Sequence, residues 1–154
     1  MKRAFPIIFA VAALVSLAGL SGAPAATDSQ TGTRVSTASS SLGKIIVDGR
    51  GRTLYLFEKD KRGHSACSGA CAMYWPPVIT NGTPKAGRGV KTSLLGTIRR
   101  ANGARQVTYA GHPLYRYLLD TKSGQTNGEG LQDFGGGWDA LSPAGKKIER
   151  GSDG

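Results

Sequence analysis

Two aspartates stand at equivalent places in two copies of one short motif. Residues 51–60 read GRTLYLFEKD and residues 111–120 read GHPLYRYLLD, so both copies share G-x-x-L-Y-x-[FY]-x-x-D. Two carboxylates roughly 5 to 10 Å apart can act as general acid and base, or as nucleophile and acid, in a hydrolase. Asp60 and Asp120 could instead cap the turns that follow their strands by accepting backbone N–H bonds. Their recurrence in a repeat favours this structural role.

The same motif places aromatic side chains before each aspartate. Tyr55 and Phe57 in the first copy correspond to Tyr115 and Tyr117 in the second. Residues two apart on a strand share a face, so each pair is expected on one side of its strand. The pattern favours a core position, with the Tyr hydroxyls finding polar partners at its edge. A platform on which a ligand stacks is the alternative.

The chain has two cysteines, Cys67 and Cys71. In an exported protein an even number of cysteines favours a disulfide, and a spacing of four on a helical turn brings the two Cα atoms within bonding range. The alternatives are free thiols, or a redox or metal site in which His64 and His112 join the cysteines, since zinc and copper accept both ligand types. We predict no cofactor.

Short strands and turns must position these residues. Asp48-Gly49 and Asn102-Gly103 are strong hairpin signals, and the run before Trp75-Pro76-Pro77 favours a short helix that the prolines end. The predicted elements are a hairpin over 43–58, a helix within 67–74, and strands at 94–100, 106–110, 114–119 and 138–141.

The composition indicates a turn-rich β protein, since glycines number 23 of 154 residues and separate β-branched and aromatic runs. We predict an all-β fold: one small antiparallel domain over 42–150, made of two tandem repeats (about 42–79 and 93–149), with long loops and one short helix near the cysteines. Residues 26–41 are rich in Ser, Thr, Ala and Gly. They are expected to form a flexible leader.

Residues 1–25 have the features of a secretory signal peptide. Lys2 and Arg3 precede an apolar stretch over 4–20, and Ala23-Pro24-Ala25 forms a small-residue cleavage site. The expected location is periplasmic or extracellular, with no transmembrane helix after cleavage. No cysteine follows the small residues near position 20, so lipid attachment is not expected.

The charge balance is strongly basic. Lys and Arg number 20 and Asp and Glu number 10, and removing Lys2 and Arg3 leaves 18 against 10. A basic surface attracts anionic partners such as envelope polymers, anionic lipid or nucleic acid. The basic residues form no block, and we find no specific nucleic-acid motif. The partner stays unknown: the spread of the charges favours a basic surface with no specific partner, and anionic envelope components are the alternative.

The chain resembles the family of secreted repeats, predicted to be lipoproteins, that carry a Y-x-[FWY]-x-x-D motif. The resemblance rests on residues 55–60 and 115–120, on the CSGAC run at 67–71 followed by WPPV at 75–78, and on LGTI at 95–98, QVTY at 106–109 and HPLY at 112–115. It implies export and repeat architecture, and it implies no reaction. The missing lipidation cysteine is where this chain departs from the lipoprotein label.

The leading functional hypothesis is therefore an exported, non-enzymatic β-repeat module of the cell envelope, with a binding or structural role. One alternative is a periplasmic redox or metal-binding protein that uses copper, zinc or haem and depends on Cys67, Cys71, His64 and His112. The other is a hydrolase that uses Asp60 and Asp120. The chain has no G-x-S-x-G elbow, P-loop or dinucleotide fingerprint.

Overall fold

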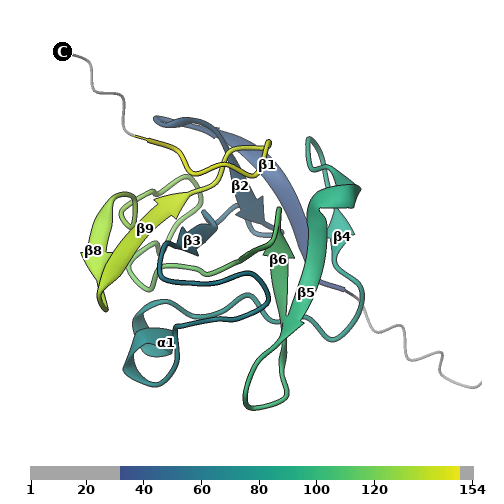
Figure 1. The fold of residues 1–154 in the computed structure, drawn as a ribbon. Helices are drawn as coiled ribbons and strands as arrows, with labels where there is room; N and C mark the ends of the chain where they lie inside the picture. Colours follow the sequence, from purple (N-terminus) through teal and green to yellow (C-terminus); the bar gives the residue numbers. More distant parts are fainter. Residues whose placement is uncertain (1–31, 150–154) are drawn as a thin grey trace, which may run out of the picture.

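A computed structural model describes residues 32–149 of the chain. In this part, three small sheets and one short helix enclose a shared core (Figure 1). The fold is therefore all-β, as predicted. The elements in chain order are β1 (Arg34–Ser40), β2 (Gly43–Asp48), β3 (Tyr55–Phe57), α1 (Ala70–Tyr74), β4 (Lys85–Ala86), a 3₁₀ turn η1 (Thr92–Leu94), β5 (Leu95–Arg99), β6 (Arg105–Tyr109), β7 (His112–Pro113), β8 (Leu131–Asp133) and β9 (Gly136–Ala140).

The first sheet has the order β2-β1-β4 and corrects the predicted leader. β1 pairs antiparallel with β2 over its whole length, from Val35 opposite Asp48 to Ser40 opposite Gly43. The prediction of a flexible segment over 26–41 is wrong for Arg34–Ser40, because backbone pairing on both sides and the fully buried Val35 order a run whose composition is polar. Residues 1–31, with the predicted signal peptide and the start of the leader, lie outside the described part.

The predicted turn at Asp48-Gly49 is present, and it leads into the first copy of the motif. Val47 forms a bridge with Thr53, and the N–H of Gly51 donates to the carbonyl of Asp48 at 3.0 Å. The chain beyond is buried on both faces of the backbone. Leu54 and Leu56 enter one hydrophobic cluster, while Tyr55 and Phe57 enter another. The motif strand therefore separates two halves of the core.

The second sheet, in the order β3-β9-β8, joins the two repeats. β3 of the first repeat pairs antiparallel with β9 of the second, with Phe57 opposite Trp138. β9 also pairs with β8 through a tight turn at Phe134-Gly135. The strand predicted at 138–141 is thus present as β9, and it lies beside the first motif (Figure 1).

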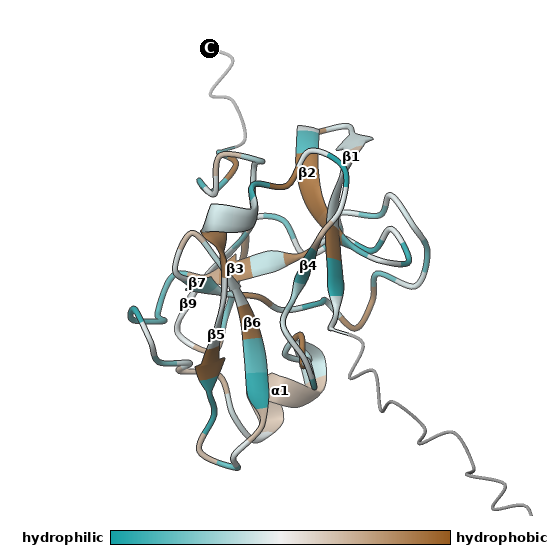
Figure 2. Cartoon of the chain, turned by 90° about the vertical axis from the view of Figure 1, so that its right-hand side faces the viewer, coloured by the Kyte–Doolittle hydropathy of each residue, from teal (hydrophilic) through white to brown (hydrophobic). Residues whose placement is uncertain are grey.

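The third sheet, in the order β5-β6-β7, contains the second predicted hairpin. Leu95 lies opposite Tyr109 and Arg99 opposite Arg105, and Gly103 adopts the positive φ of 84° that the Asn102-Gly103 turn requires. The strand predicted over 114–119 is reduced to bridges at Tyr115, because the chain turns at residues 118–119. Figure 2 shows hydrophobic residues along β2 and a hydrophilic stretch on β6.

Candidate functional site

The two motif tyrosines lie next to each other at the centre of the molecule. The N–H of Tyr55 donates to the carbonyl of Tyr115 at 2.9 Å, and the N–H of Tyr115 donates back to the carbonyl of Tyr55 at 3.0 Å. Equivalent residues that exchange both backbone bonds form an antiparallel pair. This pair marks the position of an approximate twofold relation between the repeats.

Each tyrosine hydroxyl bonds the aspartate of the other repeat. The hydroxyl of Tyr55 donates to Oδ2 of Asp120 at 2.5 Å, and the hydroxyl of Tyr115 donates to Oδ2 of Asp60 at 2.7 Å. Both tyrosines are fully buried. Burial, together with the neighbouring carboxylate, raises the pKa of both phenols far above its ordinary value. The phenols therefore stay protonated and act as hydrogen-bond donors.

The second oxygen of each aspartate caps a local turn. Oδ1 of Asp60 accepts the N–H of Ala66 at 2.6 Å, and Oδ1 of Asp120 accepts the N–H of Asn127 at 2.9 Å. Each carboxylate thus has a structural role in two ways: it holds the loop that follows it, and it binds the other repeat. The predicted cap is present in both copies.

The other two motif aromatics, Phe57 and Tyr117, form a stack of four rings with Trp75 and Trp138 across the repeat boundary. Phe57 stacks on Trp138 with centroids 4.1 Å apart, Trp138 stacks on Trp75 at 3.9 Å, and Trp75 contacts Tyr117 at 4.4 Å. Tyr55 meets Trp75 edge-on at 5.4 Å, and its equivalent meets Trp138 in the same way. Since both tryptophans and Phe57 are buried, these rings are core, and only Tyr117 at the end of the stack is half-exposed.

The two aspartates differ in their surroundings. Asp120 is 5 % exposed, whereas Asp60 is half-buried and lines two cavities, both of which are also lined by His112. Burial raises the pKa of Asp60, and the hydrogen bonds from Ala66 and Tyr115 oppose this rise. None of the cavities described here is lined by both aspartates.

Cys67 and Cys71 form a disulfide beside the short helix, with their Cα atoms 5.2 Å apart. Cys67 is fully buried and Cys71 is 5 % exposed, and both pack in the core with Trp75. Thiol–disulfide exchange needs access to a sulfur atom, so this burial favours a structural bridge over a redox site. Only Cys71 lies in α1, because the helix begins at Ala70.

The two histidines lie apart from any assembled ligand set. His64 is exposed at the edge of a cavity of about 640 Å³ that is also lined by Cys67 and Arg99, and His112 is half-buried in β7. Burial lowers the pKa of His112, as does the positive charge of Arg62. Among residues 32–149, no three His, Cys, Asp or Glu side chains are placed to hold a metal ion together.

A second charged centre, which the motif does not include, surrounds Asp48. Oδ1 of this buried carboxylate accepts the N–H groups of Arg50 and Arg52, and Oδ2 accepts Nε of Arg52 and Nε of Arg116, each at 2.9 Å. Burial alone would raise the pKa of Asp48, but the hydrogen bonds from Arg116, Arg52 and Arg50 hold it below its ordinary value. The carboxylate therefore stays charged and fixes two guanidinium groups.

Sequence reasoning missed the centre at Asp48, although a signal for it exists. At the offset that aligns the motifs, Arg116 corresponds to Leu56, Arg52 to His112, and Asp48 to Thr108. The centre at Asp48 therefore has no equivalent in the other repeat at this offset.

The fold and its central motif define a class: an all-β protein made of two repeats that exchange tyrosine–aspartate hydrogen bonds. A family model described as a secreted repeat of unknown function matches the chain twice, over residues 36–79 and 96–142. The two matches cover more than half of the chain, so the protein belongs to this family of secreted repeats.

A search of curated proteins and a search of solved structures each returned no match. Between residues 32 and 149, no helix has the length and hydrophobicity that crossing a membrane requires.

Proposed function

We propose that the protein is an exported, non-enzymatic β-repeat module that binds an anionic component of the cell envelope, in the periplasm or outside the cell. The family's description as secreted supports the export. The observation that supports the binding role is that most of the exposed charged side chains are basic.

Few acidic side chains of the described residues are fully exposed. Asp48, Asp120 and Glu129 are buried, Asp60, Asp133 and Asp139 are half-buried, and Glu58 and Glu149 are exposed. The exposed basic residues of the same part of the chain are Arg34, Lys44, Arg50, Lys59, Lys61, Arg62, Lys85, Arg88, Lys91, Arg99, Lys122, Lys146 and Lys147.

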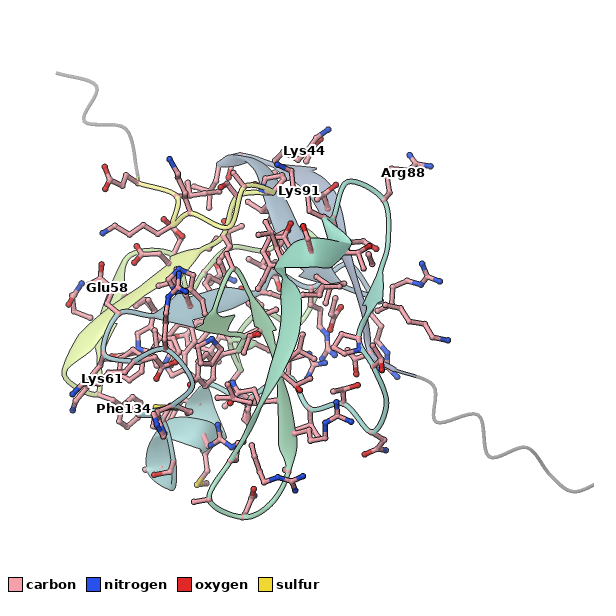
Figure 3. The ribbon with its side chains drawn as sticks, turned by 45° about the vertical axis from the view of Figure 1, so that its right-hand side comes forward. Lys44, Glu58, Lys61, Arg88, Lys91 and Phe134 are labelled. Carbon is pink, nitrogen blue, oxygen red and sulfur yellow. A yellow bond between two sulfur atoms is a disulfide. The ribbon has the colours of Figure 1, made fainter. Side chains whose placement is uncertain are left out.

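The exposed acids are also neutralised locally. Nζ of Lys147 lies 2.8 Å from Oε1 of Glu58 and 4.0 Å from Oε1 of Glu149. Figure 3 shows Lys44, Arg88 and Lys91 on the outside of the molecule, away from Glu58. The surface is thus more uniformly positive than the composition indicates, and such a field attracts polyanions.

The central aspartates support the non-enzymatic part of the proposal. In Asp60 and in Asp120, one carboxylate oxygen accepts a hydrogen bond from a tyrosine hydroxyl and the other accepts one from a backbone N–H. Carboxylates held in this way stabilise the fold, and the same arrangement recurs in both repeats.

The test is co-sedimentation of the purified chain with anionic and with neutral envelope polymer fractions at low and high salt. We expect binding to the anionic fraction only, and a steep loss as added salt shortens the Debye length from about 30 Å at 0.01 M to about 3 Å at 1 M. The size distribution of the polymer should stay unchanged during incubation. Equal binding to both fractions, or shortening of the polymer, would contradict the proposal.

A further inference from the structure

The geometry points to a phosphate-binding site in the arginine-lined cavity above Asp48, and we propose that this site takes the phosphate groups of the anionic partner. The inference rests on the proposed function for the identity of that partner, while the site itself can be tested with inorganic phosphate alone. The cavity measures about 360 Å³ and is lined by Thr33, Arg34, Asp48, Gly49, Arg50, Arg52 and Arg116.

The site has a large local excess of positive charge. Four arginines and a single acidic residue line the cavity, and the guanidinium groups of Arg52 and Arg116 contact that carboxylate, which is only 4 % exposed. Like charges held close together repel one another, so clustering them costs folding free energy that a bound anion offsets. A volume of 360 Å³ falls within the range of about 300–1,000 Å³ that is usual for ligand pockets.

The buried carboxylate orients the two inner arginines and leaves donors free. Arg116 uses only Nε on Asp48, at 2.9 Å, so both of its terminal nitrogens lack a protein partner among residues 32–149. Arg52 uses Nε and Nη2 on the same oxygen. The planar guanidinium fork matches phosphate oxygens in pairs. Asp48 therefore holds the two terminal nitrogens of Arg116, and Nη1 of Arg52, in place before any ligand arrives.

The two outer arginines stand at the rim. Arg34 begins β1 and Arg50 lies in the turn after β2, and both side chains are exposed without a hydrogen bond to the described residues. The large apolar side chains that are exposed elsewhere, such as Phe134 and Leu119, do not line this cavity. A polar, basic rim without apolar residues favours a phosphate group in water or on a polymer over the surface of a bilayer.

The site also breaks the symmetry of the repeats. Arg116 comes from the second copy of the motif and Arg52 from the first, so the cavity needs both repeats. Its equivalents at the aligned offset are Leu56, His112, Thr108 and Ala110, which provide neither the carboxylate nor the guanidinium groups. One such site per chain is therefore expected, in contrast to the paired tyrosines and aspartates.

The experiment is a titration of the full chain with inorganic phosphate at constant ionic strength, followed by NMR and calorimetry. Arg116→Gln and Arg50→Gln should each weaken phosphate binding about tenfold or more, since a hydrogen bond to a charged group contributes about 1.5–3 kcal/mol. Arg50→Gln leaves the hydrogen bonds and ion pairs of the described residues intact, because the Arg50 guanidinium makes none of them, and thermal unfolding of the variant checks that it folds. The matched control is Arg88→Gln, which removes the same charge from an exposed loop and should change affinity less than twofold.

Two further arms complete the design. Arg116→Lys keeps the charge but loses the fork, and should bind phosphate more weakly than wild type. Polyphosphate and vesicles of anionic phospholipid, compared at equal phosphate, separate a soluble polymer from a lipid headgroup, and polyphosphate should bind more tightly.

The outcomes separate this inference from the proposed function. Equal losses in Arg88→Gln and the pocket variants, or phosphate shifts confined to other residues, would overturn the site. If the wild type binds envelope polymer and Arg116→Gln binds it as well as Arg88→Gln does, the site is wrong while the proposed function stands. If phosphate binds the cavity but no envelope fraction binds the chain, the proposed function is wrong and the site stands.

Discussion

The hydroxyl of Tyr55 lies 2.5 Å from Oδ2 of Asp120, although the two residues are 65 positions apart in the chain. Tyr115 and Asp60 repeat this relation in the opposite direction at 2.7 Å. The tyrosine and the aspartate that recur at the same spacing in each motif therefore bond partners in the other motif. Every tyrosine–aspartate bond at the centre of the protein is a bond between repeats.

Removing either aspartate should destabilise the fold. Asp120→Ala leaves the buried hydroxyl of Tyr55 and the N–H of Asn127 without their acceptor, at a cost of about 1–3 kcal/mol. Asp60→Ala should cost less, because Asp60 is half-buried and the hydroxyl of Tyr115 keeps a second partner, Oγ of Ser65 at 2.6 Å. Thermal unfolding measures both. Variants that melt like the wild type would refute the framework role and return these carboxylates to the list of candidate catalytic groups.

A double-mutant cycle should detect the exchange between repeats. Tyr55→Phe and Asp120→Ala remove the two sides of one bond, so their effects on the free energy of unfolding should couple by about 0.5 kcal/mol or more. The matched control is Tyr115→Phe combined with Asp120→Ala, two residues that share no hydrogen bond between their side chains, and its coupling should be smaller. Equal coupling in the two cycles would contradict the assignment of partners.

The disulfide should contribute modestly to stability. It closes a loop of only five residues, for which the loop-entropy relation gives about 2 kcal/mol. Replacing Cys67 and Cys71 together by Ser should lower the denaturant midpoint accordingly. A reducing agent should lower the wild-type midpoint to a similar degree and leave the double variant unchanged. A wild-type midpoint that does not respond to reduction would show that the bridge is absent from the purified protein.

The buried carboxylate of Asp48 should make stability depend on acid. Its pKa is lowered in the folded state, so its contribution is present above the ordinary carboxyl pKa of about 3.9 and is lost as the pH falls through the lower, folded value. Denaturant unfolding between pH 7 and pH 2.5 should therefore show a flatter profile for Asp48→Asn, which is also less stable at pH 7. The control is Glu58→Gln, which removes an exposed ion pair and should change the profile little. Parallel curves for wild type and Asp48→Asn would contradict the assignment.

Local signals predicted the elements that local forces determine. The Asp48-Gly49 and Asn102-Gly103 turns and the pairing of Cys67 with Cys71 depend on neighbours within a few residues. The same reasoning predicted the caps at the two aspartates, because an aspartate after a strand has backbone N–H groups within reach.

Features that depend on distant partners could not be predicted in this way. β1 has a polar composition and is ordered by β2 and β4 on either side. The partner of Tyr55 is determined by the fold and not by spacing in the sequence. The centre at Asp48 joins Arg116 to a turn 68 residues earlier, and sequence reasoning missed it.

The exchanged tyrosine–aspartate bonds make the folding of each repeat depend on the other repeat. A single half in isolation would carry a donor and an acceptor that do not meet each other, and it could satisfy both only by meeting a second half in solution. Its folding would then obey mass action and fail on dilution. Carrying both halves on one chain keeps each at a fixed, high effective concentration around the other, so the structure persists at any dilution that an exported protein meets.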